Sequence, residues 1–476
     1  MGIQRPTILK FGGTSVEDSG AFERVASIVL SQRESSPVVV VSAMSGVTDS
    51  LLGSAQKALE GDVEEAVNSL EPEFKRHFAV VNALFGEGGA EVERTLGESR
   101  SRISSLLLYL SQRPQARSML QDEIVSYGER LSALLLTHIL RGRKLDAQLV
   151  DARRCIITDE EHGRAAPFWP ETELGTNAEI KPLLEGSRVP VLGGFIGATR
   201  EGVTTTLGRG GSDYTAALVG AALSAGEIQI WTDVSGVLTA DPRVVKLAQT
   251  ISRLSYAEAA ELAYFGAKVL HPKTVYPAVD RGIPLRICNS RAPHEAGTVI
   301  GHERERSPRG IKAIAHKKGI TTLQISSGQM LGAYGFLRGL FEIFERHRTV
   351  VDVVTTSEVS VSLSLDNPRA LPSILKDMKQ LGTVEVEDHQ AIICVVGEGL
   401  SSTSGIAGKI FSTISDINVS LISQGASRIN LSFVIDEARV SEAVSRLHKA
   451  FFEANVEGME INSKAESHDR LVPTSS

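Results

Sequence analysis

Short runs of apolar and β-branched residues alternate with longer amphipathic stretches over the first 300 residues of the chain. Each run is bounded by glycine, proline or polar residues, and most lead through a turn into a segment with helical periodicity. This alternation is typical of strands connected by helices over a mostly parallel sheet. It predicts an α/β sandwich with ligands at the carboxyl ends of its strands. The expected strands are residues 7–10, 37–42, 147–150, 189–195, 228–232 and 284–289.

The pattern changes after a charged stretch at residues 302–310, which holds almost nothing to bury and predicts an inter-domain linker. Beyond it, residues 335–366 align without gaps on residues 405–436. In each copy a helix-like segment leads into a β-branched strand, a polar turn and an alternating strand. Such duplicated units are usually small ferredoxin-like (βαββαβ) domains. The predicted organisation is a domain at 1–301, the linker at 302–310, two regulatory-type units at 311–390 and 391–462, and a disordered tail at 463–476.

Length and charge narrow the class of protein. A chain of 476 residues is too long for a single small binding module. The net charge of -7 provides no electrostatic footprint for nucleic acid or for an anionic membrane. Three widely separated cysteines form no C-x-x-C pair, and no apolar run approaches the roughly 20 residues that span a bilayer. We therefore expect a cytoplasmic protein whose partners are small molecules and other copies of itself.

The first candidate for chemistry is the segment KFGGTS, which begins at Lys10 directly after the first predicted strand. Gly12 and Gly13 allow backbone N–H groups to approach a phosphate, and Lys10 is placed to neutralise charge on a transferring phosphoryl group. The segment is not a Walker A loop, because no G-x-x-x-x-G-K-[ST] occurs in the chain. The alternative is a tight turn with a solvated lysine.

A second candidate is the segment TTTLGRGGSD at residues 204–213, before a helix expected at 214–225. Ser212 or Asp213 is predicted to cap that helix, whose N–H groups and dipole then face an anion. The planar fork of Arg209 suits a carboxylate or a phosphate. An ordinary capped turn is the alternative.

A third candidate joins a strand to a loop that contains glycine and proline, at residues 230–243. Thr232 and Asp233 end the strand and suit the base and ribose edge of a nucleotide, while Arg243 is placed to reach its phosphates. On its own the segment equally fits a plain strand-to-loop junction.

Other polar positions are less distinctive. Lys268 follows a helix expected at residues 256–265 and suits a nucleotide phosphate, although a solvated lysine fits as well. His271 precedes a proline and favours a helix start or a packing role. Glu129 lies in a long helical pattern, where a surface carboxylate is the default and recognition of an ammonium group is the alternative. No cluster has the spacing of protein metal ligands, so a metal is expected to arrive as Mg-ATP.

Taken together, KFGGTS, GRGGSD, WTDVSG and FGAKVLHP in this order closely resemble the aspartate kinases of the amino acid kinase superfamily, from about residue 7 to about residue 452. The resemblance implies a kinase domain of the α/β/α sandwich type followed by two ACT domains, which are ferredoxin-like amino-acid sensors. It implies transfer of the γ-phosphoryl group of ATP to the β-carboxylate of L-aspartate, the first step of lysine, threonine, methionine and diaminopimelate biosynthesis.

The resemblance also assigns site residues. The implied catalytic positions are Lys10, Gly12, Gly13 and Asp213. The implied aspartate-side positions are Ser42, Thr48, Glu129, Arg209, Ser212 and Asp213, with Arg209 on a carboxylate and Glu129 on the ammonium group. The implied ATP-side positions are Lys10, Gly12, Thr232, Asp233, Arg243 and Lys268. Leu238 stands where many members carry a tyrosine near the adenine, so an aromatic contact to the base is not implied.

Within the repeat, one set of residues matches the effector pocket of the lysine-inhibited, single-chain type. These are Met330, Phe336, Leu337, Val351, Asp352, Thr356, Ser357 and Glu358. Asp352 and Glu358 suit a cationic side chain or an ammonium group, whereas Ala333 and Val350 stand where lysine-binding relatives often carry serine. L-Lysine is therefore the favoured effector, and an ACT–ACT interface is the alternative reading. The resemblance further implies a homodimer through the ACT domains, with a tetramer as the larger assembly.

Three other functions compete with this interpretation. Glutamyl, acetylglutamate, carbamate and uridylate kinases of the same superfamily fit poorly with the GRGGSD loop and the two repeats. A fusion to homoserine dehydrogenase as the whole protein is excluded, because no room for a dinucleotide-binding domain follows residue 452 and no G-x-G-x-x-G is present. A non-catalytic amino-acid sensor would be expected to have lost Lys10, Arg209 or Asp213, and all three are retained.

Overall fold

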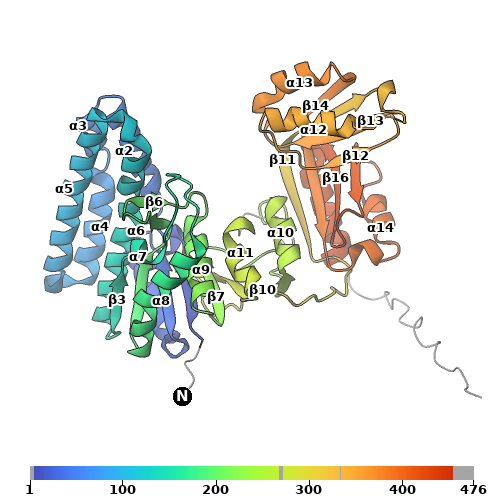
Figure 1. Ribbon diagram of the computed structural model, residues 1–476. Coiled ribbons are helices and arrows are strands. Elements are labelled where there is room, and N and C mark those ends of the chain that lie inside the picture. Colours follow the sequence, from blue (N-terminus) through green and yellow to red (C-terminus); the bar gives the residue numbers. More distant parts are fainter. Residues whose placement is uncertain (1–4, 267–271, 333, 454–476) are drawn as a thin grey trace, which may run out of the picture.

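The structure is a computed structural model that describes residues 5–266, 272–332 and 334–453. It contains an eight-stranded sheet with helices and a six-stranded sheet with shorter helices, joined by an extended segment (Figure 1). The tail predicted to be disordered, residues 463–476, lies outside the described residues.

The eight-stranded sheet has the order β3-β4-β2-β1-β7-β9-β10-β8 and is parallel except where β10 pairs with β9. Each of the six predicted strands coincides with one of its members, which confirms the mostly parallel α/β class. The sequence did not indicate β8, β10 or the separate β5–β6 hairpin (Ile196–Ala198, Thr204–Thr206). The strands are β1 (Thr7–Phe11), β2 (Pro37–Val41), β3 (Ala147–Val150), β4 (Val189–Gly193), β7 (Glu227–Thr232), β8 (Arg253–Ser255), β9 (Leu285–Asn289) and β10 (Thr298–Gly301).

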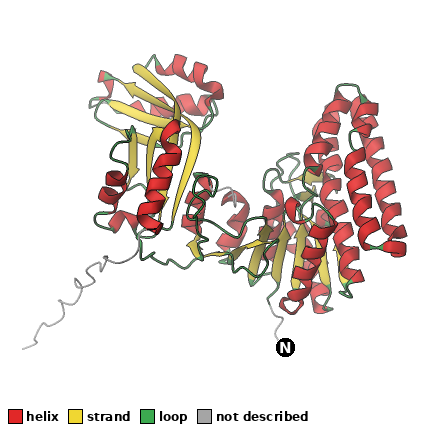
Figure 2. Cartoon of the chain, turned by 180° about the vertical axis from the view of Figure 1, so that it is seen from behind, coloured by secondary structure: helices red, strands yellow, loops and turns green. Residues whose placement is uncertain are grey.

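Helices cover both faces of this sheet (Figure 2). Alternate strand residues point to opposite faces, so Leu9 and Phe11 join one apolar core while Ile8 joins the other. On the first face the helices continue into a long arm that rises away from the sheet (Figure 1). The helices are α1 (Ser19–Ser31), α2 (Val47–Leu59), α3 (Val63–Asn68), α4 (Glu71–Leu84), α5 (Ala90–Gln112), α6 (Arg117–Gly142), α7 (Ala152–Cys155), α8 (Trp169–Glu185), α9 (Gly211–Ala222), α10 (Tyr256–Tyr264) and α11 (Pro272–Asp280). Within the described ranges, no helix has both the length and the apolar character needed to cross a membrane.

The six-stranded sheet is antiparallel, with the order β12-β13-β11-β14-β16-β15. Its strands are β11 (Ala313–Ser326), β12 (Val354–Thr356), β13 (Ser360–Leu365), β14 (Thr383–Val396), β15 (Leu421–Gln424) and β16 (Asn430–Asp436). Its helices are α12 (Phe336–Arg346), α13 (Leu371–Met378), α14 (Ile406–Thr413) and α15 (Val440–His448). Two separate apolar clusters fill it, one centred on β13 with α12 and α13, the other on β16 with α14 and α15. We call these the first and the second ACT unit.

The two units are nested rather than placed in tandem. The first half of β11, from Ala313 to Lys318, pairs with residues 391–396 of β14, and Ile314 packs in the core of the second unit. The second half of β11 pairs with β13 of the first unit. The sequence-based boundary placed residues 311–318 in the first unit. The structure differs because a register shift at Gly319, whose φ is +72°, lets one 14-residue strand serve both units.

The two halves of the molecule are in direct contact, with α10 and α11 between the large sheet and the ACT units (Figure 1). Ala240 and Val245, on the loop after β7, belong to the apolar core of the second ACT unit. The backbone N–H of Ile314 donates to the carbonyl of Thr239 at 2.8 Å, and the Thr239 hydroxyl lies 2.9 Å from Nε2 of His448. The loop that carries Arg243 is therefore anchored to the regulatory half.

Candidate active site

A cleft of about 350 Å³ opens where β1, β2 and β4 end. Among its lining residues are Lys10, Gly13, Ser42, Thr48, Glu129, Ser212 and Asp213, which the sequence analysis had placed on four separate segments. The carboxyl ends of parallel strands meet at one edge of a sheet, so topology brings these segments together. Ser42, which follows β2, is bonded to the end of β1, because its N–H donates to the Phe11 carbonyl at 3.0 Å.

Lys10 stands at the floor of this cleft. Its Nζ lies 2.7 Å from Oδ1 of Asp213, and the two side chains are only 11% and 16% exposed. The Gly12 N–H donates to the Trp231 carbonyl at 3.0 Å, which fixes the turn after β1. A Cβ on Gly13 would lie 3.0 Å from the Ala43 carbonyl oxygen, so this loop approaches its neighbour too closely for a larger residue.

Glu129 is buried in α6 with 4% of its surface exposed, so the default reading as a surface carboxylate was wrong. Burial raises the pKa of Glu129 to about 8, although a hydrogen bond from the Ala43 backbone and the charge of Lys10 act in the opposite direction. Its Oε2 atom is buried and has no hydrogen-bond partner among the described residues. Such a carboxyl group, aimed at a cleft, is suited to receive a cationic donor.

Two helices point their N-termini at the cleft. Helix α2 begins after Gly46 and α9 begins after Gly210, each of which has a positive φ (85° and 73°). Residues of both first turns line the cleft, so free N–H groups and two helix dipoles favour an anion there.

The prediction that Ser212 or Asp213 caps α9 was wrong. The helix starts earlier than the sequence suggested, Gly210 is its N-cap, and no side chain caps it. Asp213 therefore lies inside the first turn, where its carboxylate is available for the ion pair with Lys10.

Arg209 is exposed and lines an adjacent pocket of about 330 Å³ rather than the cleft itself. The two hollows share Thr48, Phe195 and Gly208. The sequence reasoning missed the buried carboxylate behind Arg209, which is Asp122.

Asp122 accepts hydrogen bonds from His162 Nδ1 (2.9 Å), the Gly163 N–H (3.0 Å), the Thr206 N–H (3.1 Å) and the Thr206 hydroxyl (2.6 Å). It thereby holds the loop that packs against Gly208. Its position seven residues before Glu129, on the same face of α6, is the signal that could have identified it.

Of the expected nucleotide-side residues that the structure describes, Lys10 lines the cleft, whereas Gly12, Thr232, Asp233 and Arg243 do not. Thr232 ends β7, and its carbonyl accepts from Ser290 Oγ at 3.0 Å, while Ser15 Oγ donates to Ser290 Oγ at 2.8 Å. This chain of hydroxyls links the Thr232 end of β7 to the loop after β1. Asp233 is exposed, and its Oδ1 accepts from the Thr232 hydroxyl at 3.1 Å.

Arg243 and Leu238 lie on the loop between β7 and β8. The Arg243 guanidinium holds Asp241 at 2.7 Å and is 81% exposed, and Leu238 is half-buried in a bridge to Thr250. Lys268 and His271 fall outside the described residues.

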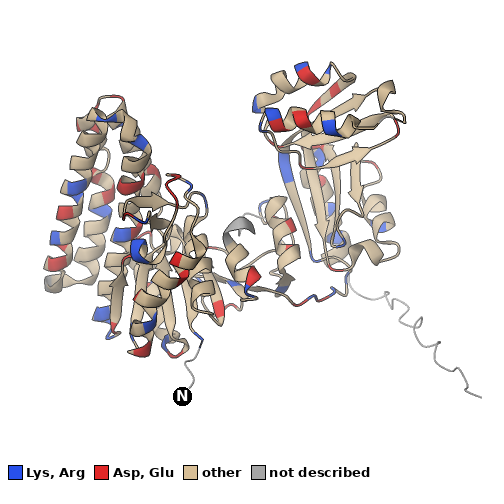
Figure 3. Ribbon diagram, in the orientation of Figure 1, with Lys and Arg blue, Asp and Glu red and all other residues tan. Residues whose placement is uncertain are grey.

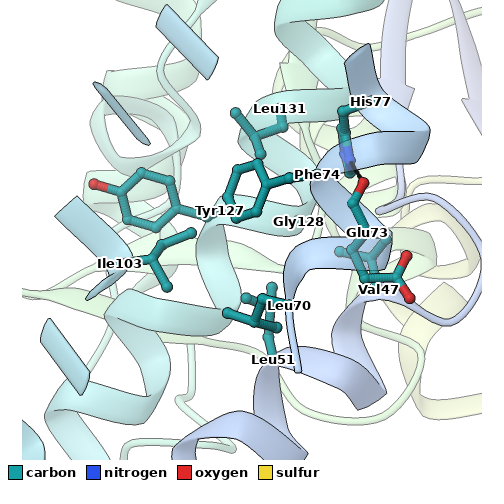
Figure 4. A pocket seen from close by; sticks show the side chains of 10 residues that line it. All are labelled: Val47, Leu51, Leu70, Glu73, Phe74, His77, Ile103, Tyr127, Gly128 and Leu131. Atoms are coloured by element: carbon teal, nitrogen blue, oxygen red, sulfur yellow. Dashed lines mark hydrogen bonds between the residues drawn. The ribbon is translucent and has the colours of Figure 1, made fainter. Parts of the chain in front are cut away.

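Other hollows differ in character from this cleft. One of about 420 Å³ lies between α10, α11 and β10 and is lined mainly by apolar and aromatic residues, among them Tyr256, Val275 and Ile300. A hollow inside the helical arm, lined by Phe74, His77 and Tyr127 among others, holds only about 10 Å³, about the room of one water molecule (Figure 4). In the view of Figure 3, basic and acidic positions alternate along the helices of both halves. Across the part of the chain that the structure describes, no group of three or more potential metal ligands occurs.

The expected effector residues all fall in the first ACT unit. Met330, Phe336 and Val351 pack against its apolar core, and Thr356 ends β12. Leu337 and Glu358 are exposed, and the Ser357 hydroxyl lies 2.7 Å from that of Ser360 in the turn to β13. The Asp352 side chain is buried, with 1% exposed. Val350, at the position of the missing serine, is exposed, and Ala333 lies outside the described residues.

Comparison with known proteins agrees with this architecture. The sequence pattern of the amino acid kinase family matches residues 5–289, and that of an ACT domain matches residues 393–451. The chain is 38% identical to lysine-sensitive aspartokinase 3 of Escherichia coli over 94% of this chain and 99% of the relative. It is 36% identical to a chloroplastic aspartokinase 2 of Arabidopsis thaliana, over 95% and 86% of the two chains.

Solved structures extend the likeness to three dimensions. Aspartokinase III of Escherichia coli in complex with aspartate and ADP superposes with a TM-score of 0.79 at 37% identity, covering 94% of this chain and all of that one. The same enzyme in complex with lysine and aspartate superposes with a TM-score of 0.77 at 38% identity, covering 94% and 99%. The chain belongs to the aspartokinases, the members of the amino acid kinase family that phosphorylate aspartate.

Proposed function

We propose that the chain transfers the γ-phosphoryl group of Mg-ATP to the β-carboxylate of L-aspartate and forms 4-phospho-L-aspartate in the cleft around Lys10. The observation that carries the assignment is a single cleft that holds a lysine–aspartate ion pair, a buried carboxyl group and two helix N-termini. An amino acid with an ammonium group and a negatively charged acceptor matches each of these features.

On the amino-acid side, Glu129 receives the ammonium group of aspartate. Its buried Oε2 atom lacks a partner in the described chain, and binding of a cation there favours the ionised carboxylate. Arg209 takes the α-carboxylate from the neighbouring pocket through its two parallel N–H groups. Ser42, Thr48 and Ser212 supply hydroxyl groups around the same space.

On the phosphoryl side, an oxygen of the β-carboxylate attacks the γ-phosphorus while the bond from phosphorus to the β,γ-bridging oxygen breaks, and ADP leaves. The acceptor is already anionic at neutral pH, so the reaction requires no general base. Catalysis then depends on holding two anions together. Lys10, the N–H group of Gly13 and the N-termini of α2 and α9 offset their repulsion. The Gly12 N–H, bonded to the Trp231 carbonyl, holds this loop in place, and Asp213 orients Lys10 through the 2.7 Å ion pair.

The nucleotide is proposed to lie along the ends of β7 and β9, with Thr232, Asp233 and Arg243 on its side of the cleft and with Lys268 reaching its phosphates. Magnesium accompanies ATP as part of the substrate. Since Arg243 already pairs with Asp241, its guanidinium is held in a fixed position at the loop.

Regulation is proposed to be inhibition by L-lysine bound at the first ACT unit, around Met330, Phe336, Leu337, Val351, Asp352, Thr356, Ser357 and Glu358. A relative of similar fold has been solved with lysine, and the buried carboxylate of Asp352 supplies a site for an ammonium group. The ACT units are also proposed to form the interface of a homodimer.

The test is formation of aspartyl hydroxamate from ATP, Mg²⁺, L-aspartate and hydroxylamine, with and without millimolar L-lysine, L-threonine or L-methionine. We expect product that depends on aspartate and falls with lysine. Product that ignores lysine would retain the kinase and reject lysine as effector. Absence of product from a folded protein that still binds lysine would identify a non-catalytic sensor instead.

A further inference from the structure

One face of α10 is bonded to the regulatory half of the molecule. Three polar side chains at intervals of three residues each make one contact across the boundary, and this spacing places them along one side of a helix. The three contacts are Glu258 with Lys312 (2.9 Å), Glu261 with Asn430 (2.7 Å) and Tyr264 with Asp352 (2.5 Å). Lys312 directly precedes β11, the strand that leads into the ACT units. Asn430 lies in the second unit, and Asp352 lies in the first. Helix α10 therefore contacts the segment that leads into the ACT units and one residue in each unit.

The last of these contacts involves the carboxylate proposed to bind the effector. Oδ1 of Asp352 accepts a hydrogen bond from the Tyr264 hydroxyl and lies 3.5 Å from Nζ of Lys317, which is also 2.8 Å from Asp366. Oδ2 of Asp352 is buried and has no partner among the described residues. Burial raises the pKa of Asp352, and the Tyr264 hydroxyl and the Lys317 charge act against that rise. One oxygen is thus occupied, and the other is prepared for a cationic donor.

Tyr264 makes contacts with both halves of the molecule. Its ring packs edge-on against Phe265 with centroids 5.1 Å apart, and the Lys317 ammonium lies 4.9 Å from the ring centroid. The next residue, Gly266, has a φ of 119°, and a Cβ there would lie 2.3 Å from the His316 carbonyl of β11. The chain after α10 is therefore pressed against an ACT strand immediately before it continues to Lys268.

We propose that Tyr264 of the catalytic half completes the effector site, its hydroxyl holding Oδ1 of Asp352 while an ammonium group of the effector binds Oδ2. This inference rests on the proposed function, and it adds a residue that determines effector affinity and connects the effector to α10. The hydroxyl fixes the orientation of the carboxylate, so its removal weakens effector binding. By linkage, bound effector strengthens the same contact and stabilises one position of α10.

The experiment compares Tyr264→Phe with Tyr256→Phe in the full-length protein, using L-lysine as the probe. Tyr256 is a matched control, because it lies on the same helix but its hydroxyl donates to the Ile283 carbonyl at 2.6 Å, within the catalytic half. Calorimetry is expected to show a dissociation constant for lysine raised at least about five-fold by Tyr264→Phe and unchanged by Tyr256→Phe. The lysine concentration that halves hydroxamate formation should rise in parallel.

Three results would overturn the inference. An unchanged lysine affinity in Tyr264→Phe would show that the hydroxyl takes no part, and a higher affinity would show that it competes with the effector. An equal loss in Tyr256→Phe would reduce the effect to general packing of α10. As a further check, Tyr264→Phe should add nothing in an Asp352→Asn background if the two groups act together. Calorimetry requires no turnover, so an inactive chain that binds lysine as expected would contradict the proposed function and leave this inference standing.

Discussion

Replacing Glu129 by glutamine is expected to remove a pH dependence that the buried carboxyl group imposes on aspartate binding. Burial raises the pKa of Glu129 to about 8, so the side chain is mostly neutral at pH 7. Only the ionised form attracts the ammonium group of the substrate strongly. The KM for aspartate should therefore fall as the pH rises towards and past 8.

The size of the effect follows from the ionised fraction. With a pKa of about 8, roughly 3% of the wild-type carboxyl groups are ionised at pH 6.5 and roughly three quarters at pH 8.5, which corresponds to a fall in KM of about 25-fold. The ammonium group of free aspartate stays protonated across this window. Glutamine retains the shape but not the charge, and a hydrogen bond to a charged group contributes about 1.5–3 kcal/mol, so KM at pH 8.5 should rise by about 10- to 150-fold.

The assay is steady-state hydroxamate formation at saturating Mg-ATP, with KM for aspartate measured at half-unit steps between pH 6.5 and 8.5. Glu123→Gln is the matched control, because Glu123 lies on the same helix and directs its oxygens to Thr204 and Arg130 instead of the cleft. It should reproduce the wild-type profile. A wild-type KM that stays constant over this range, or a Glu129→Gln profile parallel to that of the wild type, would refute the assignment of Glu129 to the ammonium group.

Three further changes test other parts of the structure. Lys10→Met should lower kcat by about 10²- to 10³-fold with a smaller change in KM for aspartate; a loss under ten-fold in steady-state kinetics would argue against direct contact with the phosphoryl group. Asp122→Asn replaces a carboxylate that accepts four hydrogen bonds, so the loop behind Arg209 should become less well fixed. The KM for aspartate should then rise about ten-fold, and the KM for ATP should stay unchanged. Equal changes in both KM values would contradict a role of Asp122 on the amino-acid side. Lys312→Met leaves the fully buried Glu258 with its hydrogen bonds from Ser255 but without its cationic partner, and should lower the free energy of unfolding by about 3–5 kcal/mol. Adding Glu258→Gln should restore part of the loss, and an unchanged transition temperature in thermal unfolding would show that the ion pair does not stabilise the fold.

The catalytic sheet was largely predictable from sequence because its strands are buried on both faces. A buried parallel strand is a continuous apolar run such as residues 37–41, and a glycine-containing turn follows several of these runs. The carboxyl-end rule then places Lys10, Ser42 and Asp213 near one another without further information. The structure brings these three residues to one cleft.

The features that sequence reasoning missed depend on tertiary packing. Helix α6 is covered on nearly every side, so Glu129 and Asp122 are buried although the default for a charged helical residue is exposure. Helix α9 begins after Gly210 because that residue adopts a left-handed conformation. The local composition is compatible with a start at any of several neighbouring residues. The hydrogen bond between Tyr264 and Asp352 joins positions 88 residues apart, and no local sequence pattern predicts it.

The strands that the two ACT units share also determine which fragments of the regulatory half can fold alone and which can be exchanged between relatives. Because β11 and β14 each run through both ACT units, residues 391–453 expressed alone would lack a central strand of their own sheet and would expose its edge. Residues 320–390 are connected to the second unit through β11 and β14, which pair with each other. The two ends of this segment therefore lie close together, as in an inserted domain. A chimaera that exchanges effector specificity between relatives should therefore transplant that inner segment as one piece, with the strands around it left in place.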